Sequence, residues 1–158
     1  MYGTYTHHMG YGYGIWLVYD GDQFVTPHIG HVTVACFMQE ENARRLYADI
    51  RRVCPSQISV QVTGAPESFP AAYYARDTNK MHSWGYNCTS DKWPLLRDIC
   101  VHYDADFSPQ AHTSIEYGMD PALFSPVAME GADARTMECD ICLVDIRSDF
   151  PVDWRILL

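Results

Sequence analysis

The sequence contains little positive charge. Only two of its 158 residues are lysine, and 20 acidic residues outnumber 11 Lys and Arg, for a net charge of −9. Long nucleic acids and anionic membrane surfaces are bound through many contacts to Lys and Arg. The composition therefore argues against both as partners, and leaves open a small anionic ligand that is held at a few points.

Long hydrophobic runs are absent as well. No segment approaches the ~20 apolar residues of a transmembrane helix. The first residues, MYGTYTHHMGYGYG, have neither the basic start nor the continuous apolar stretch of a signal peptide. These absences predict a cytoplasmic protein. No low-complexity tract or long linker divides the sequence, so residues 1–158 are expected to form a single domain.

The cysteines predict neither disulfides nor a metal centre. All six lie in apolar segments, at Cys36, Cys54, Cys88, Cys100, Cys139 and Cys142. There they are expected to be reduced core residues. Cys139 and Cys142 have the C-x-x-C spacing of zinc and redox sites. However, the surrounding ECDICLVDIR alternates as a strand does, and residues three apart on a strand point to opposite faces.

The pattern of apolar residues predicts an α+β protein. Strands are expected at residues 13–20, 31–37, 57–64, 112–117 and 137–147, with a hairpin formed by 71–77 and 83–88 and a short closing strand at 154–158. Helices are expected at residues 39–53 and 91–103. The first helix has an apolar stripe with arginines mostly on the other side, which is typical of a solvated outer face.

Two of the predicted strands begin with a histidine followed, one residue later, by a hydroxyl residue. These pairs are His31 with Thr33 in HIGHVTVACF, and His112 with Ser114 in AHTSIEYG. Residues i and i+2 of a strand share a face, so each pair is expected to act together. The histidines lie about half the chain apart, and each half also holds one amphipathic helix. This layout suggests a pseudo-twofold α+β fold with one motif in each lobe.

Two imidazoles and two hydroxyls suit chemistry at a phosphodiester. Imidazoles exchange protons near neutral pH, so one can take a proton while the other gives one. Hydroxyls can donate hydrogen bonds to the non-bridging oxygens of a phosphate. A site of this kind needs no metal ion or other cofactor to open or hydrolyse the bond.

The motifs HVT and HTS resemble the signature of the 2H phosphoesterase superfamily, which has two His-x-Ser/Thr motifs in a bilobal α+β fold. The resemblance implies antiparallel sheets that form a central cleft, with helices packed outside. It also implies that His31 and His112 are the acid–base pair and that Thr33 and Ser114 bind phosphate. Family members act on 2′,3′-cyclic phosphates, 2′–5′ linkages, RNA ends and cyclic oligonucleotides.

In its compact size and its acidity, the chain resembles one branch of that superfamily more than the others. Viral and phage members, including the anti-CBASS phosphodiesterases, degrade cyclic nucleotide second messengers, which would place the protein in a host cytoplasm. The bacterial RNA-ligase-like branch often has a basic residue shortly after its second motif, where this chain reads HTSIEYG.

Glu116 continues the alternation from His112 and Ser114, and is expected on the same face. A carboxylate there would raise the pKa of His112. His112 is then the expected general acid, and His31 the base. A structural or solvent-facing glutamate is the alternative.

Several aromatic side chains are candidates for stacking on nucleobases, with packing in the protein as the alternative for each. They are Tyr11, Tyr13, Tyr74, Trp84, Tyr86 and Trp154. Tyr11 and Tyr13 are favoured, because the glycines around them allow the backbone to approach a ligand closely.

The leading interpretation is a metal-independent phosphodiesterase that acts on a small nucleotide, through attack by a 2′-hydroxyl or by water. The first alternative is an RNA-end enzyme, such as a 2′,3′-cyclic phosphodiesterase or a 2′–5′ RNA ligase-like protein. A second is a non-catalytic nucleotide-binding sponge. The last is an α+β protein of another family whose two histidines face the core.

Overall fold

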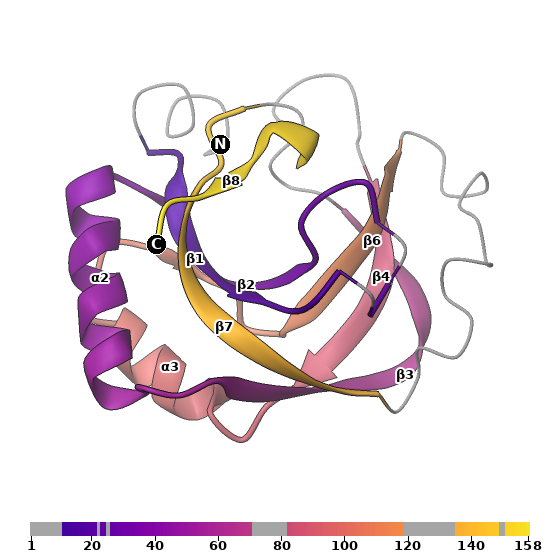
Figure 1. The fold of residues 1–158 in the computed structure, drawn as a ribbon, viewed down its shortest axis with the longest axis horizontal. Helices are drawn as coiled ribbons and strands as arrows, with labels where there is room; N and C mark the ends of the chain where they lie inside the picture. Colours follow the sequence, from indigo (N-terminus) through magenta and orange to yellow (C-terminus); the bar gives the residue numbers. More distant parts are fainter. Residues whose placement is uncertain (1–10, 22, 25, 71–81, 119–134, 149–150) are drawn as a thin grey trace.

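The structure is a computed structural model that describes residues 11–21, 23–24, 26–70, 82–118, 135–148 and 151–158. It is α+β and mostly antiparallel sheet, as predicted (Figure 1). The strands are β1 (Tyr13–Val18), β2 (His31–Met38), β3 (Ile58–Pro70), β4 (His82–Thr89), β5 (Asp106–Phe107), β6 (His112–Gly118), β7 (Thr136–Asp145) and β8 (Arg155–Ile156). The helices are α2 (Glu40–Val53), α3 (Trp93–Cys100) and the short 3₁₀ turn η4 (Pro151–Asp153).

Six of the described strands form a closed antiparallel ring. Its order is β1, β2, β6, β4, β3 and β7, and β7 pairs with β1 again. The short strands β5 and β8 extend the sheet along β2 and β7, and β8 is labelled in Figure 1. The family resemblance implied more than one antiparallel sheet, whereas the described strands all belong to one. Strands β2 and β6, which carry the two motifs, are neighbours in the ring.

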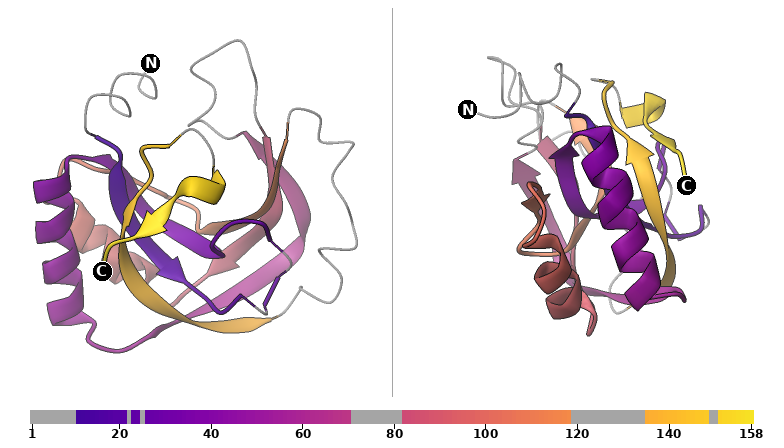
Figure 2. Two further views of the ribbon diagram at one scale, coloured as in Figure 1. Left: turned by 45° about the horizontal axis from the view of Figure 1, so that its top comes forward. Right: turned by 90° about the vertical axis from the view of Figure 1, so that its left-hand side faces the viewer.

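The two helices lie together on one side of the ring (Figure 2). Helix α2 buries Ala43, Leu46 and Ile50, which recur every three or four residues, while its arginines remain outside. Glutamates in its first turn and arginines in its last complement the helix dipole. Helix α3 has Pro94 in its first turn, where a proline costs no hydrogen bond. Neither described helix has the length and apolar character needed to cross a membrane.

Alternation along the strands separates two apolar clusters. In β1, Ile15 and Leu17 point into the large core that the helices also line, whereas Trp16 belongs to a smaller cluster on the other face. Strand β7 divides in the same way, with Cys139 in the large core and Cys142 in the small cluster. The predicted opposite orientation of these two cysteines is therefore confirmed. All six cysteines are free thiols.

The C-terminal segment, residues 151–156, places Trp154 in the smaller cluster and is fixed by an ion-pair network. Asp145, at the end of β7, lies opposite Arg155 of β8, and its carboxylate accepts hydrogen bonds from Arg147 and Arg155. Burial opposes ionisation of Asp145, but these hydrogen bonds outweigh it and lower its pKa. The segment thereby holds the Trp154 ring edge-on against Trp16, with 5.8 Å between the ring centroids.

Candidate functional site

The two predicted motifs meet across a single residue pair. Val32 of β2 lies directly opposite Thr113 of β6 in the antiparallel ladder. The motif residues on either side then face one another, His31 with Ser114 and Thr33 with His112. Opposite residues share a face, as do residues i and i+2. All four motif side chains therefore lie on one face of the sheet, with the two histidines on one diagonal and the two hydroxyls on the other.

Each motif histidine is held by the carbonyl group two residues before it. The Nδ1 atom of His31 lies 2.7 Å from the carbonyl oxygen of Ile29, and Nδ1 of His112 lies 3.3 Å from that of Gln110. A carbonyl oxygen only accepts, so both Nδ1 atoms carry the hydrogen. In each ring Nε2 is then the atom that can take up a proton. The two halves of the site match in hydrogen bonding as well as in sequence.

The two histidines differ in burial. His31 is 5% exposed, and its ring stacks on that of Trp16 with centroids 3.5 Å apart and planes 6° from parallel. Burial, reinforced by the nearby imidazoles of His28 and His112, lowers the pKa of His31 to about 3. His112 is only half-buried, and burial lowers its pKa despite the hydrogen bond to Gln110. Both rings are neutral at neutral pH when no ligand is bound.

A third histidine connects the two motif strands. The Nε2 atom of His28 donates to the carbonyl oxygen of Ser114, 2.9 Å away, and its ring centroid lies 6.0 Å from that of His31. Burial lowers the pKa of His28 as well. The sequence analysis missed this residue, because it has no hydroxyl residue two positions later. Its place three residues before His31, in HIGH, was the available signal.

Thr113 joins the same two strands from the core side. Its hydroxyl donates to the carbonyl oxygen of His31 at 2.9 Å, and its oxygen lies 2.6 Å from the phenol oxygen of Tyr19. Since the Thr113 hydrogen goes to the carbonyl, the phenol donates to Thr113. Burial raises the pKa of Tyr19, so that donor keeps its proton. The backbone that carries the first histidine is thus joined to β6 from the core face of the sheet.

The Ser114 side of the site is closed by aromatic rings. Ser114 is 7% exposed, and its side chain forms a hydrogen bond with Tyr117. The Tyr117 ring lies 5.3 Å from His28 and 6.1 Å from Trp154, centroid to centroid. Trp154 in turn lies 6.2 Å from His31. Burial raises the pKa of Tyr117 to about 12, so its phenol remains protonated.

The His112 side of the site is more open. The ring of Phe69 stacks on that of His112, with centroids 4.6 Å apart and planes at 27°. Asn87 of β4 lies directly opposite His112, and its Nδ2 donates to the carboxylate of Glu67. Phe69 and Asn87 are half-buried, and Glu67 is exposed. The sequence analysis missed these three residues, because only the pairing of distant strands brings them to the histidine.

Glu116 does not take its predicted place. The register of β6 against β4 shifts by one residue between Ser114 and Glu116, so the strict alternation is interrupted there. Glu116 lies opposite Trp84, which packs against the large core, whereas Tyr117 reaches the Ser114 side chain. The pKa of His112 is lowered by burial, and the predicted rise is therefore wrong.

Most of the aromatic residues predicted to stack on nucleobases have another place. Tyr13 and Tyr86 are buried in the large core, so for both the predicted stacking role is wrong and the alternative, packing, holds. Trp84 is half-buried against the same core. Trp154 reaches the site face, but it packs in the smaller cluster. Tyr74 lies outside the described residues.

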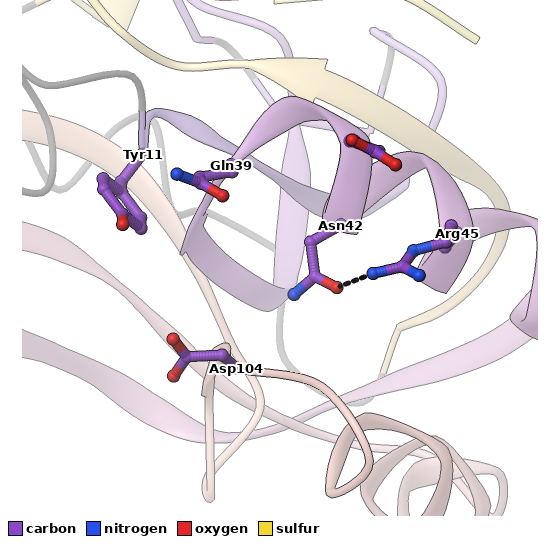
Figure 3. A pocket seen from close by; sticks show the side chains of 6 residues that line it. Tyr11, Gln39, Asn42, Arg45 and Asp104 are labelled. Atoms are coloured by element: carbon purple, nitrogen blue, oxygen red, sulfur yellow. Dashed lines mark hydrogen bonds between the residues drawn. The ribbon is translucent and has the colours of Figure 1, made fainter.

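Tyr11 lines a pocket of about 220 Å³ at the start of α2 (Figure 3). The lining residues are Tyr11, Gln39, Glu41, Asn42, Arg45 and Asp104. Because β1 and β2 are antiparallel, Tyr13 pairs with Met38, and His31 pairs with Val18 at the other end of β1. At about 3.3 Å per residue, Tyr13 and Val18 lie about 17 Å apart along the strand. The structure therefore does not bring Tyr11 to the first histidine.

No protein-family model matches the chain, and no curated protein matches it. Among the residues that the structure describes, no three His, Cys, Asp or Glu side chains are grouped so as to hold a metal ion. The sheet face that carries the two motifs offers two imidazole Nε2 atoms for proton transfer and two hydroxyls as hydrogen-bond donors.

Proposed function

We propose that the protein is a phosphodiesterase of the 2H type that cleaves a small nucleotide by two-histidine acid–base catalysis. One observation carries the proposal. The Val32–Thr113 pair sets the two motifs side by side on one face of the sheet, and both histidines make the same hydrogen bond through Nδ1. We take this pair as the position of the pseudo-twofold axis that relates the two lobes. Two unrelated core histidines would have no reason to share this arrangement.

The proposed reaction uses each motif side chain once. Thr33 and Ser114 donate hydrogen bonds to the non-bridging oxygens of the bound phosphate. Nε2 of His31 takes the proton of the substrate 2′-hydroxyl, and that oxygen forms a bond to phosphorus. The bond from phosphorus to the leaving 5′-oxygen breaks, and Nε2 of His112 gives its proton to that oxygen. A 3′–5′ linkage then yields a 2′,3′-cyclic phosphate and a free 5′-hydroxyl.

Burial supports this division of roles. With a pKa of about 3, His31 is unprotonated throughout the neutral range, which is the state that a base must have before it takes the proton of the 2′-hydroxyl. His112 is less buried, and the single negative charge of a bound phosphodiester beside it would favour its protonated form. Water can replace the 2′-hydroxyl when the substrate is itself a cyclic phosphate. The two histidines then exchange roles.

The first experiment measures turnover in EDTA for the wild type and for His31→Ala and His112→Ala. The panel holds 2′,3′-cyclic mononucleotides, 2′–5′ and 3′–5′ dinucleotides, and cyclic dinucleotides. We expect the wild type to cleave at least one of them, and each variant to lose about 100-fold or more in kcat/KM. His102→Ala removes an exposed histidine of the segment after α3, and serves as the matched control.

Three results would contradict the proposal. Activity that EDTA abolishes would point to metal-assisted chemistry, and activity that survives both substitutions would place the reaction elsewhere. Tight binding of a nucleotide without any turnover would favour the alternative in which the protein is a non-catalytic nucleotide-binding sponge. Among positive results, a preference for RNA ends would favour the RNA-end enzyme over a second-messenger phosphodiesterase.

A further inference from the structure

We propose that Phe69, Asn87 and Glu67 form the subsite for the nucleobase on the leaving side of the cleaved bond, and that this subsite selects guanine. The inference rests on the proposed function in one respect, the assignment of His112 to the leaving 5′-oxygen. The nucleoside that carries this oxygen must then lie beside His112.

The two sides of the site differ in the room that they leave for a base. Beside His31, the rings of Trp16 and Trp154 are 2% and 8% exposed and pack on one another. Neither offers an open face. Beside His112, Phe69 is half-buried and stacks on the imidazole at 4.6 Å. Among the described aromatic residues in contact with a motif histidine, Phe69 is the one with substantial exposure.

The polar groups next to Phe69 define which base edge fits. Glu67 and Phe69 are two residues apart on β3, and Asn87 lies across from His112 on β4. A carboxylate only accepts hydrogen bonds, so Asn87 must donate through Nδ2 to Glu67. The Asn87 amide is thereby oriented with its oxygen as a remaining acceptor. Glu67 is exposed and keeps further acceptor positions on its two oxygens.

A surface that accepts hydrogen bonds selects a base that donates them. Guanine has two adjacent donors on its Watson–Crick edge, N1–H and the 2-amino group, which match the two oxygens of a carboxylate. Adenine places the acceptor N1 at the same position, and cytosine places N3 there. Uracil has a single donor, N3–H, between two carbonyl oxygens. Of the four bases, guanine is the one that Glu67 can bind through two hydrogen bonds.

The test uses one substrate in which either guanosine or adenosine can be the leaving nucleoside. 3′,3′-cyclic GMP–AMP has two phosphodiesters, whose leaving 5′-oxygens belong to guanosine and to adenosine, and the linear product shows which bond was cut. We expect the wild type to cut the guanosine bond at least about tenfold faster. Glu67→Gln should bring this ratio below about threefold, because an amide can pair with either purine.

Further variants separate stacking from selection. Phe69→Leu should lower kcat/KM about tenfold or more at both bonds without changing their ratio, and Phe69→Tyr should retain activity. Glu138→Gln is the matched control: Glu138 is also exposed, and it also accepts a hydrogen bond from a side chain of the neighbouring strand, Ser59. It should keep the wild-type ratio.

A binding measurement distinguishes failure of the subsite from failure of the proposed function. GMP should bind the wild type about tenfold more tightly than AMP, and Glu67→Gln should remove the difference. Cleavage with no preference between the two bonds, or equal binding of GMP and AMP, would overturn the guanine subsite while leaving the enzyme in place. Guanine-selective, Glu67-dependent binding with no cleavage of any substrate would support the subsite and refute the phosphodiesterase.

Discussion

At the scale of single residues, a neutral imidazole stacked on an indole ring makes the fold sensitive to acid. The pKa of His31 falls from 6.5 in the unfolded chain to about 3 in the folded one. Between these values the unfolded chain binds a proton that the folded protein does not, so stability falls as pH decreases below 6.5. At pH 5 this residue alone would cost about 2 kcal/mol relative to pH 7.

The expected outcome is a smaller loss of stability when His31 is replaced. Urea denaturation at pH 7 and pH 5 should show that His31→Gln loses less unfolding free energy over this interval than the wild type does, by about 2 kcal/mol. Comparing the change with pH, rather than the stability itself, removes the cost of repacking against Trp16. The exposed His102→Gln is the control, and an equal loss in all three proteins would contradict the buried neutral state of His31.

At the scale of elements, the position of β6 depends on one glycine of β4. A Cβ atom on Gly85 would lie 1.8 Å from the carbonyl oxygen of Thr113 and 3.1 Å from Cα of Ser114, both backbone atoms of β6. A side chain there would have to displace the strand that carries the second motif, since neither backbone atom can rotate away. Gly85 thus sets the spacing of the two strands at the register shift.

We therefore expect Gly85→Ala to destabilise the protein by about 1–3 kcal/mol and to lower kcat/KM at least about tenfold, although Gly85 contributes no side chain to the site. Gly21→Ala is the control, because a Cβ on this exposed glycine meets no atom within 4 Å. Both variants can be compared by urea denaturation and by turnover. A Gly85→Ala protein with wild-type stability would show that β6 approaches β4 less closely than described.

The elements that could be predicted from the sequence are those with an unbroken period. Helix α2 differs from its prediction by one residue, and β2 begins at His31 as predicted, because apolar periodicity is a local property. Strand β3 extends beyond the predicted end at Gly64, which has φ +68°, through a stretch where the register against β4 changes. The two-residue strand β5 is too short to have a period, and it was missed.

In the candidate site, too, the sequence predicts the relations that lie within one strand and misses those that depend on how strands pair. The i, i+2 spacing predicted that His31 and Thr33 share a face, because this relation needs only one strand. Phe69 and Asn87 could not be predicted, since their contact with His112 depends on the pairing of three strands. The prediction that Glu116 shares a face with His112 failed for a similar reason. The register shift between β4 and β6 depends on strand pairing, and it leaves no trace in the alternation of residues along the sequence.

At the scale of the whole molecule, the net charge of −9 opposes the approach of an anionic nucleotide. Added salt screens this repulsion, because the Debye length shortens from about 20 Å at 0.02 M to about 7 Å at 0.2 M. We expect kcat/KM for a dinucleotide to rise about twofold between these concentrations. Sodium chloride titration of the initial rate checks this, and binding of a long RNA that weakens steeply with salt would instead favour the RNA-end alternative.

The Val32–Thr113 pair has a consequence for how the protein reaches its native state. It joins two strands that are separated by about half the chain, and the ring is closed by β1 and β7 from opposite ends of the described sequence. Pairings between such distant segments form late, because the loop entropy must be overcome before the contacts form. Neither half of the chain contains both imidazoles, so a folding intermediate with one finished half has no complete site. The return of activity during refolding would therefore report the meeting of the two halves, rather than the earlier formation of helices and hairpins.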